Sequence, residues 1–235
     1  YYIPASVRMN DLVEHRERSD RFQLLNGEWK FQYYNSIYDV TESFYEKGYD
    51  VSGFDQVTVP GVWQMDGYDT HQYTNIRYPF PFDPPYVPQD IPCGAYVHNF
   101  EYHREEKASK AFLNFEGVDS CFYVWVNGAY AGYSQVPHAT SEFDVTDLLN
   151  EGENTLAVLV LKWCDGSYLE DQDKFRMSGI FRDVYLLKRP ETTIRDYHIT
   201  TDVEKDSVVV KLDMHFAEPV ETKVTIEDKY GAVVA

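Results

Sequence analysis

Strand-like segments separated by turn residues recur along most of this chain, and this rhythm restricts the possible folds more than any other feature. The segments alternate apolar and polar residues or are rich in aromatic and β-branched residues, and they occupy 28–34, 55–63, 95–103, 110–118, 121–126, 141–149, 154–163 and 182–189. Helical periodicity is nearly absent between them, so the spacing predicts an antiparallel β-sandwich or barrel rather than βαβ units. Asn127 and Gly128 follow the fifth segment, and because both tolerate positive φ, we expect a tight hairpin there.

Three segments depart from the common pattern. The segment 154–163, "NTLAVLVLKW", is almost continuously apolar, which is typical of a central strand covered on both faces. The segment 79–92, "PFPFDPPYVPQDIP", is rich in proline, which cannot donate to a strand ladder, so we expect an ordered loop held by its aromatic residues. The segment 41–50, "TESFYEKGYD", has the spacing of one or two helical turns.

The strand rhythm restarts after "LLKRPETT", which suggests a second domain. We divide the chain into a first domain at 1–188, a linker at 189–193 and the opening of a second domain at 194–235. The last region contains strand-like segments at 194–203, 207–216 and 222–231. Three strands are too few for an independent sandwich, so we expect the chain to stop inside its second domain.

Charge and composition narrow the classes of function. The chain carries 39 acidic and 21 basic residues, and its formal net charge of −18 is relieved by no basic cluster. This charge repels phosphate backbones and anionic lipids, which argues against nucleic-acid and membrane partners. Aromatic residues make up 16% of the chain. Rings pack on the C–H faces of sugars and carboxylates accept from hydroxyls, so a neutral polyol suits this composition; a merely solvated acidic surface is the plainer alternative.

The cysteines and the chain start bear on the compartment. Cys93, Cys121 and Cys164 are odd in number and lack the spacing of a zinc site or redox pair, so we expect free, mostly buried thiols. Free thiols weakly favour a reducing compartment. No run approaches the ~20 apolar residues of a membrane span. The sequence starts "YYIPAS" without Met or a signal-like stretch, which leaves the natural N-terminus open.

Familiar catalytic motifs are absent from the sequence. The seven His residues show no metal-binding spacing, Ser134 and Ser178 lie in no GxSxG turn, Cys121 has no adjacent base, and no Gly-rich phosphate loop occurs. Glycoside hydrolysis would need two carboxyl groups at a set separation, but no pair of acids is marked out by its context. The residues alone therefore identify no catalytic group.

Two polar clusters remain as candidate binding segments. Asn75 lies between a polar loop and the Pro-rich one, where its amide could pair with a ligand hydroxyl; a local turn cap is the common alternative. The segment 165–184, "DGSYLEDQDKFRMSGIFRDV", is called the acidic segment below, and its charged residues include Asp165, Glu170, Asp171, Asp173, Arg176, Arg182 and Asp183. The arginines could neutralise carboxylates in bidentate pairs and leave one acid for a ligand or cation; an internal ion-pair network is the simpler alternative.

These stretches resemble the N-terminal part of the large bacterial β-galactosidases of glycoside hydrolase family 2. The matching segments occur in the family's order: "LNGEWKF" (25–31), "VPGVWQMDGYDTHQYTN" (59–75), "PPYVP" (84–88), "VNGAYAGYSQ" (126–135), "SEFDVT" (141–146) and the acidic segment. The resemblance implies a jelly-roll sugar-binding domain followed by the first strands of an incomplete immunoglobulin-like sandwich. In the family a TIM barrel with both catalytic glutamates comes next, and we expect this barrel outside the present residues.

The resemblance also implies roles for two residues. Asn75, in "YTN", matches the family's asparagine that contacts the galactosyl unit, and Asp173, in "EDQD", matches the aspartate that binds the sugar's hydroxyls and helps hold a sodium ion. The other charged residues of the acidic segment would hold Asp173 in position. No catalytic residue is expected in this chain, which alone should be inactive. Magnesium and sodium are expected for the full-length enzyme, with the TIM barrel as partner and a homo-oligomeric parent left open.

The sequence leaves alternatives open for the substrate and for the role of this chain. Lys174 and Phe175 stand where the lactose-operon type has a Met-Trp pair, which leaves aglycone preference open. Related family members act on glucuronides or mannosides, but the combination of "YTN" and "EDQD" favours galactosides by resemblance. An autonomous carbohydrate-binding module and an oligomer contact are rival interpretations. The compartment stays open; the free thiols favour the bacterial cytoplasm, and the periplasm is the alternative.

Overall fold

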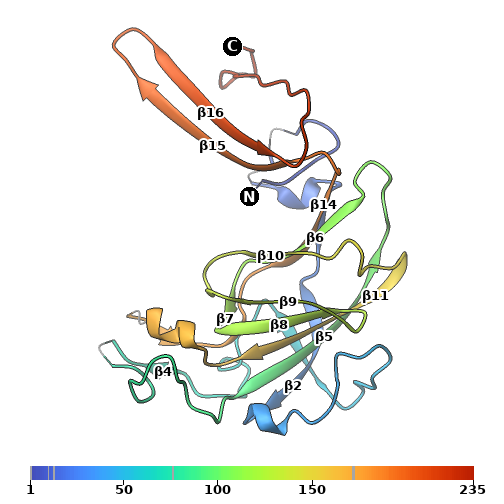
Figure 1. Ribbon diagram of the computed structural model, residues 1–235, viewed down its shortest axis with the longest axis vertical. Helices are drawn as coiled ribbons and strands as arrows, with labels where there is room; N and C mark the ends of the chain where they lie inside the picture. The colour runs from blue at the N-terminus through green and yellow to red at the C-terminus, as the bar shows by residue number, and fades with distance from the viewer. Residues whose placement is uncertain (1, 10, 13, 76, 171–172) are drawn as a thin grey trace. The chain divides into compact units, whose positions relative to one another are not determined.

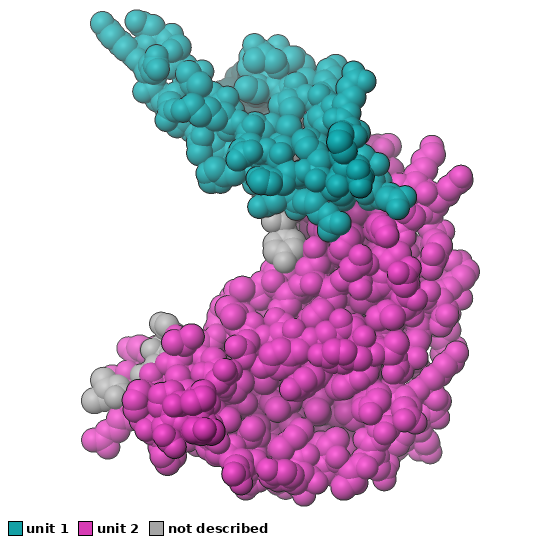
Figure 2. Space-filling model, in the orientation of Figure 1, with its two compact units in different colours: residues 1, 190–235 teal, residues 2–189 magenta. Residues whose placement is uncertain are grey.

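The computed structural model describes residues 2–9, 11–12, 14–75, 77–170 and 173–235, and the chain forms two compact units (Figures 1 and 2). The larger unit spans residues 2–189 and the smaller one 190–235. The described helical segments are short 3₁₀ turns at Arg16–Arg18 (η1), Ile37–Asp39 (η2) and Asp165–Leu169 (η3). Among the described residues, no helix has the length and apolar character needed to cross a membrane.

Two antiparallel sheets form the larger unit, as the strand rhythm predicts (Figure 1). In spatial order, the smaller sheet consists of Phe22–Leu24 (β1), Val184–Arg189 (β14), Lys110–Phe115 (β6) and Ser141–Asp144 (β10). The larger sheet consists of Asp55–Val59 (β3), Gly27–Tyr34 (β2), Cys93–Tyr102 (β5), Gly152–Leu161 (β11), Cys121–Val126 (β8) and Ala129–Gln135 (β9). Two short pairs lie beside them: Gln72–Tyr73 (β4) with Phe175–Arg176 (β12), and Val118–Asp119 (β7) with Gly179–Ile180 (β13).

The main core lies between the two sheets. Phe31 and Val158 from the larger sheet pack in one cluster with Leu113 and Leu186 from the smaller sheet, and all four are almost fully buried. Because side chains alternate across a strand, the period-2 pattern of each segment supplies this inner face. The predicted all-β sandwich is confirmed.

A second apolar cluster covers the outer face of the larger sheet. β11 pairs with β5 on one side and β8 on the other, and its residues Ala157 and Leu159 are buried on this outer face. The prediction of a central strand covered on both faces is therefore confirmed. Cys93, Cys121 and Cys164 belong to the same cluster and are free and buried, as predicted.

The segment 41–50 forms turns and no helix, so the prediction of helical turns there is wrong. Phe44 is buried against the sheet, and the next ring, Tyr45, stacks on Trp125 with centroids 4.6 Å apart. A helix would rotate successive side chains to different faces, whereas here two neighbouring rings both contact the sheet. Tertiary packing therefore overrides the local spacing.

The hairpin between β8 and β9 agrees with its sequence. Asn127 has φ 53° and Gly128 has φ 84°, the left-handed conformations that a tight turn of this kind requires. The side-chain amide of Asn127 donates to the backbone carbonyl of Leu148 at 2.8 Å, which anchors the turn to the loop before β11. The predicted hairpin is confirmed.

The smaller unit contains one two-stranded hairpin, Ile194–Val203 (β15) with Val208–Phe216 (β16). The prediction of a third strand at 222–231 is wrong, because that segment forms only an isolated bridge between Glu227 and Val233. A strand exists only where a neighbour supplies a hydrogen-bonded ladder, and the described residues of this unit supply none for 222–231.

Candidate functional site

A short strand pair brings the two candidate clusters of the sequence together. β4 and β12 run antiparallel, with Tyr73 opposite Phe175 and Gln72 opposite Arg176. β4 belongs to the polar loop that follows β3, and β12 belongs to the acidic segment that follows β11. Residues far apart in the chain therefore share one corner of the larger unit, called the β4–β12 corner below.

Asp173 lies at this corner, immediately before β12, with an exposed side chain. Its Oδ1 accepts a hydrogen bond from the hydroxyl of Tyr73, and this bond raises the pKa of Tyr73. The ring of Phe175 lies 5.6 Å from that of Tyr73 between centroids, and His71 contacts Phe175 edge-on at 5.3 Å. Within the described residues Oδ2 of Asp173 has no hydrogen-bond partner, so one carboxylate oxygen stays open to a ligand.

Asn75 lies in the bend after β4, two residues beyond Tyr73, and is exposed. It borders a hollow of about 220 Å³ together with Tyr73, Thr74 and Arg77. In the part of the chain that the structure describes, the buried hydroxyl of Thr74 has no hydrogen-bond partner. Asn75 and Asp173 therefore lie at the same corner, because Asn75 shares a hollow with Tyr73 and Asp173 accepts a hydrogen bond from it.

Among the described residues, Arg182 and Asp183 at the end of the acidic segment pair outside this segment and not with its carboxylates or arginines, contrary to the prediction. Arg182 donates from Nη1 to the backbone carbonyl of His138 at 3.4 Å. The carboxylate of Asp183 pairs with Arg16, in the segment before β1. These charges connect β14 to its neighbours instead of holding Asp173, because the chain has already left the β4–β12 corner by this point.

Other contacts fix the middle of the acidic segment. Arg176 is buried and donates from Nη1 to the backbone carbonyl of Glu170 at 3.0 Å. Nζ of Lys174 lies 3.5 Å from Oδ2 of Asp119, at the end of β7. Asp171 lies outside the described residues. Lys174 and Phe175, which stand where the lactose-operon type has a Met-Trp pair, both make structural contacts. Lys174 pairs with Asp119, and Phe175 packs on the ring of Tyr73.

A buried ion pair anchors the loop that leads to β4. Nζ of Lys162, just after β11, binds Oδ2 of Asp69, and the two side chains keep only 7% and 15% of their exposure. The Asp69 carboxylate also accepts from Nε2 of Gln64 at 3.0 Å and from the backbone N–H of Thr70 at 2.8 Å. Sequence reasoning missed this pair because its members are 93 positions apart and neither stands in a motif.

Backbone hydrogen bonds attach the start of the same loop to β13. The N–H of Gly61 donates to Ile180 at 2.8 Å, and that of Trp63 donates to Ser178 at 2.9 Å. Gly179 has φ 128°, and a Cβ there would lie 2.8 Å from the carbonyl oxygen of Gly61. Only glycine fits this close approach, so Gly179 of the acidic segment is needed for the loop to dock.

The Pro-rich segment 79–92 is an ordered loop without a strand, as predicted, and Tyr168 holds it. The hydroxyl of Tyr168 donates to the carbonyl of Tyr86 at 2.5 Å and accepts from the N–H of Asp83 at 3.1 Å. Its ring meets that of Phe80 edge-on, with centroids 5.3 Å apart. This loop is thus attached to η3, directly before the acidic carboxylates.

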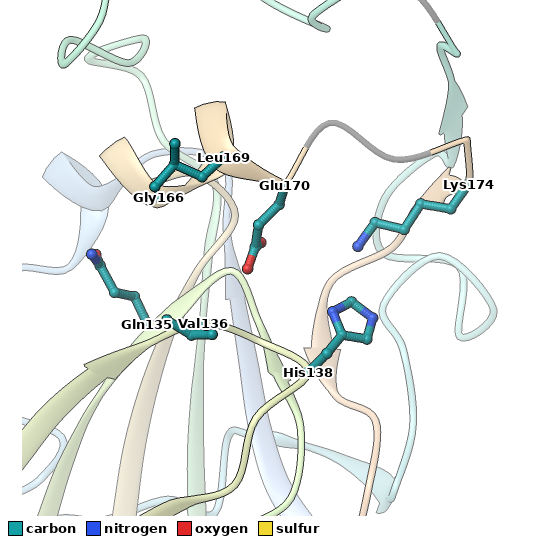
Figure 3. Close-up of a pocket in the computed structure, with 7 residues that line it drawn as sticks. All are labelled: Gln135, Val136, His138, Gly166, Leu169, Glu170 and Lys174. Atoms are coloured by element: carbon teal, nitrogen blue, oxygen red, sulfur yellow. The ribbon is translucent and has the colours of Figure 1, made fainter.

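A larger hollow of about 590 Å³ adjoins the acidic segment, and Glu170, His138 and Lys174 face its common space (Figure 3). The exposed side chains of Leu169 and Val136 line its rim. Partial burial and the nearby charge of Asp119 raise the pKa of Glu170 to about 7. Glu170 is therefore an acid that changes charge near neutral pH beside the β4–β12 corner.

Glu170 should make the stability of the protein depend on pH. An unfolded glutamate ionises near pH 4.5 while the folded one keeps its proton to about pH 7, so ionisation favours the unfolded chain between these values. Stability contributed by this group is full below about pH 4.5 and is lost as pH rises to 7. We expect Glu170→Gln to raise Tm above pH 7 by roughly 2–4 °C, a modest effect because the side chain is half-buried, and to leave Tm unchanged near pH 4.5.

Thermal melts of both proteins from pH 4.5 to pH 8 measure this difference. Burial and the positive charges of Lys174 and Arg182 lower the pKa of His138 in the same hollow, but His138 is present in both proteins. Parallel Tm curves across the whole range would show that Glu170 does not titrate in this window.

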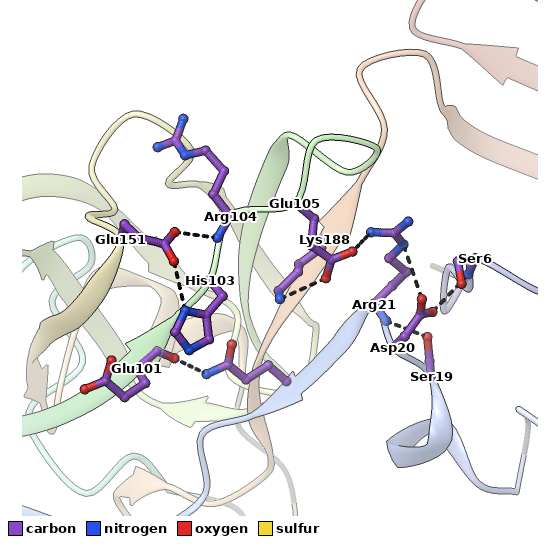
Figure 4. Close-up of polar contacts among 11 residues, drawn as sticks. Ser6, Ser19, Asp20, Arg21, Glu101, His103, Arg104, Glu105, Glu151 and Lys188 are labelled. Atoms are coloured by element: carbon purple, nitrogen blue, oxygen red, sulfur yellow. Dashed lines mark hydrogen bonds and ion pairs between the residues drawn. The ribbon is translucent and has the colours of Figure 1, made fainter.

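Other polar clusters are structural (Figure 4). Arg21 is 6% exposed and pairs with Glu105, which also lies 3.1 Å from Nζ of Lys188. Nearby, the carboxylate of Glu151 lies 2.9 Å from Nδ1 of His103. These pairs connect the residue before β1, β14, the turn between β5 and β6 and the turn before β11. Their carboxylates are engaged by cations or backbone groups, so we assign no ligand to them.

The fold and the site together define a class of protein. An antiparallel jelly-roll sandwich presents a carboxylate, an amide and aromatic rings at one loop corner, which is the arrangement of a sugar-binding β-domain. Residues 22–190 match the family described as "Glycosyl hydrolases family 2, sugar binding domain", and the chain belongs to this family.

Curated relatives of this chain are bacterial enzymes of greater length. The β-galactosidase of Actinobacillus pleuropneumoniae is 51% identical over 206 residues, which are 88% of this chain and 20% of that protein. The β-galactosidase of Staphylococcus xylosus is 46% identical over 215 residues, 91% of this chain and 21% of that protein. The chain therefore spans about a fifth of the length of the curated relatives it matches.

Solved structures with the same fold are also glycosidases. A β-glucuronidase from an uncultured Clostridium species superposes with a TM-score of 0.70 at 25% identity, covering 91% of this chain and 37% of that one. A β-glucuronidase from Ruminococcus gnavus has a TM-score of 0.71 at 17% identity and covers all of this chain and 38% of that one. The second likeness shows the fold alone.

Proposed function

We propose that this chain is the sugar-binding part of a retaining β-galactosidase and that its β4–β12 corner contacts the terminal β-D-galactosyl unit of the substrate. The observation that carries the proposal is the carboxylate of Asp173, which Tyr73 holds by one oxygen while the other has no partner among the described residues, at the same corner as Asn75. The names of the curated relatives, which match over most of this chain at 46–51% identity, support galactosides as the substrate class.

Each group at the corner has a distinct task in this proposal. The open oxygen of Asp173 accepts hydrogen bonds from sugar hydroxyls, which are stronger than neutral ones because the acceptor is charged. The amide of Asn75 both donates and accepts, which suits a hydroxyl that does both. The rings of Tyr73 and Phe175 offer an apolar surface beside them. Contacts that strengthen as the sugar ring distorts lower the barrier rather than only improving binding.

The reacting carboxyl groups belong elsewhere in this proposal. A retaining glycosidase needs an acid and a nucleophile about 5–5.5 Å apart. We propose that both glutamates and the magnesium site lie in a TIM barrel of a longer chain, in keeping with relatives about five times as long. The residues after 190, with their single described hairpin, would open an immunoglobulin-like domain between the two.

Sodium binding is a related proposal. An exposed carboxylate oxygen is a suitable ligand for a hard cation, and Oδ2 of Asp173 would supply one such ligand. The described residues contain no group of three His, Cys, Asp or Glu that could hold a metal, so the remaining oxygen ligands would come from the barrel.

Tyr73 tests whether the position of the carboxylate matters. Tyr73→Phe removes the hydroxyl that Asp173 accepts from but keeps the ring contact with Phe175. In the longer enzyme we expect kcat/KM for a β-galactoside to fall about 5- to 10-fold, the effect of one lost positioning hydrogen bond, with unchanged Tm. Steady-state kinetics measure the change. Tyr38→Phe, at another exposed tyrosine, is the matched control, and equal kinetics for both variants would contradict a role for the hydroxyl.

The proposed function is tested by hydrolysis of a chromogenic β-galactoside by this chain and by the longer protein, with the matching β-glucuronide in parallel. We expect an inactive chain and a longer protein that cleaves the galactoside at least about 100-fold faster than the glucuronide. Activity of the chain alone would place the catalytic carboxylates within these residues. Preference for the glucuronide would favour the activity named for the Clostridium structure.

A further inference from the structure

A separate hollow of about 460 Å³ lies on the outer face of the larger sheet, on elements that do not form the β4–β12 corner. Its floor is formed by Val97 and Asn99 of β5 and by Thr155 of β11, which are neighbours in the sheet. Its wall is the segment 44–51, which contributes the rings of Phe44 and Tyr49. A volume of this size fits a small ligand, since such pockets commonly span roughly 300–1,000 Å³.

The wall of this hollow is fixed by packing. Phe44 is 2% exposed, and Tyr45 stacks on Trp125 of β8. At the hairpin turn, a Cβ on Gly128 would lie 3.3 Å from the backbone nitrogen of Lys47, so wall and turn are in close contact. The wall is therefore a loop held against the sandwich at Phe44, at Tyr45 and at the hairpin turn, although residues 46–48 are exposed.

The polar groups of the hollow are only partly used. The hydroxyl of Thr155 donates to Oδ1 of Asn99 at 2.8 Å, which orients the amide and leaves its N–H₂ group without an acceptor among the described residues. Lys47 and Glu153 line the hollow, and within the described parts of the chain neither makes an ion pair. An amide donor, an ammonium donor and a carboxylate acceptor thus line one hollow, together with the apolar side chains of Val97 and Phe44.

The charges favour a neutral ligand. Glu46 and Glu153 outnumber Lys47 at the hollow, and the whole chain carries a net charge of −18, so an anion would be repelled. A metal cation would meet the amide N–H₂ of Asn99 and the ammonium of Lys47, which are donors and not ligands. A sugar is neutral, so the charges do not repel it. Its hydroxyls both donate and accept hydrogen bonds, and its C–H faces can pack on the rings and valines of the hollow.

We propose that this hollow is an accessory binding site for a neutral pyranose sugar, with Asn99 and Thr155 as its central hydrogen-bonding pair. The site is distinct from the β4–β12 corner in every lining residue and would hold a mono- or disaccharide without cleaving it. This inference does not rest on the proposed galactosidase activity.

Titration of this chain with lactose, followed by NMR amide shifts, tests the site. We expect shifts at residues 47, 99, 153 and 155 that saturate with a Kd of about 1–10 mM, typical of a small site with few contacts. Glycerol at the same molar concentration, which lacks a ring, should leave these amides unshifted. Asn99→Ala should weaken lactose binding about 5- to 10-fold, and Thr155→Val, which keeps the shape but removes the hydroxyl, should do the same.

Two controls separate this site from the proposed catalytic corner. Gln56→Ala removes an exposed amide from β3 of the same sheet and should leave the Kd unchanged. Asp173→Ala should also leave the Kd for lactose unchanged. A failure of the accessory-site proposal can therefore be distinguished from a failure of the galactosidase proposal. Shifts confined to residues 73–75 and 173, equal shifts with glycerol, or an unaltered Kd in Asn99→Ala would each overturn the accessory site.

Discussion

Replacing Asp173 by Asn in the longer enzyme lowers kcat/KM for a β-galactoside by about 100-fold or more, the effect expected when one charged group that binds the transition state is lost. The change keeps the size of the side chain but removes its charge, so hydrogen bonds from sugar hydroxyls weaken. Tm should stay within about 1 °C of the parent, because an exposed residue with one described side-chain contact contributes little to folding. Steady-state kinetics and thermal melts on the same preparation measure both quantities.

Asp165→Asn is the matched control. Asp165 is an exposed acid of the same acidic segment, and its carboxylate accepts only from the N–H of Gly166 at 2.9 Å among the described contacts. We expect normal kinetics for this variant. A loss of several degrees in Tm with normal kinetics in Asp173→Asn would mean that the carboxylate fixes the loop and binds no sugar.

Replacing Lys162 by Met destabilises the protein by about 3–5 kcal/mol, because it leaves the carboxylate of Asp69 buried without its cation. For a protein of this size the loss corresponds to a fall in Tm of roughly 10 °C. Methionine keeps the length of the apolar stem, so the change tests the charge and not the packing. Denaturant unfolding with a constant m-value measures the free energy.

The double variant Lys162→Met with Asp69→Leu distinguishes the loss of the whole ion pair from the loss of one partner. Removing both charges removes the unpaired buried group, so we expect the double variant to recover most of the stability lost in the single one. Lys211→Met is the exposed control: its pair with Asp202 is more than half exposed, and its loss should cost less than about 1 kcal/mol. Equal effects of Lys162→Met and Lys211→Met would show that water reaches the buried pair.

The Lys162 pair also bears on the site. Asp69 lies in the loop between β3 and β4, six residues before Asn75, so the ion pair holds the loop that carries the corner asparagine. In the longer enzyme Lys162→Met should therefore raise KM as well as lower stability, whereas Lys211→Met should do neither.

Local patterns in the sequence were enough to place most strands of the sandwich, although the short edge strand β1 was missed. The alternation in each segment decides which side chains can be buried together, and the continuous apolar run at 154–163 requires cover on both faces. Asn127 and Gly128 select their turn by φ alone. Where a segment depended on distant neighbours the same reasoning failed: 41–50 packs rings instead of forming a helix, and 222–231 finds no partner strand among the described residues.

Sequence by itself determined the all-β class, the order of most strands along the chain and the buried thiols, and through resemblance it proposed Asn75 and Asp173 as sugar contacts. Only the tertiary structure decided that Tyr73 holds Asp173, that Lys162 neutralises Asp69, and that Asn99 and Thr155 share a hollow. The physical reason is the distance along the sequence over which each kind of interaction acts. Burial patterns and turn preferences act within a few residues, whereas these contacts join strands that become neighbours only when the antiparallel sheets close.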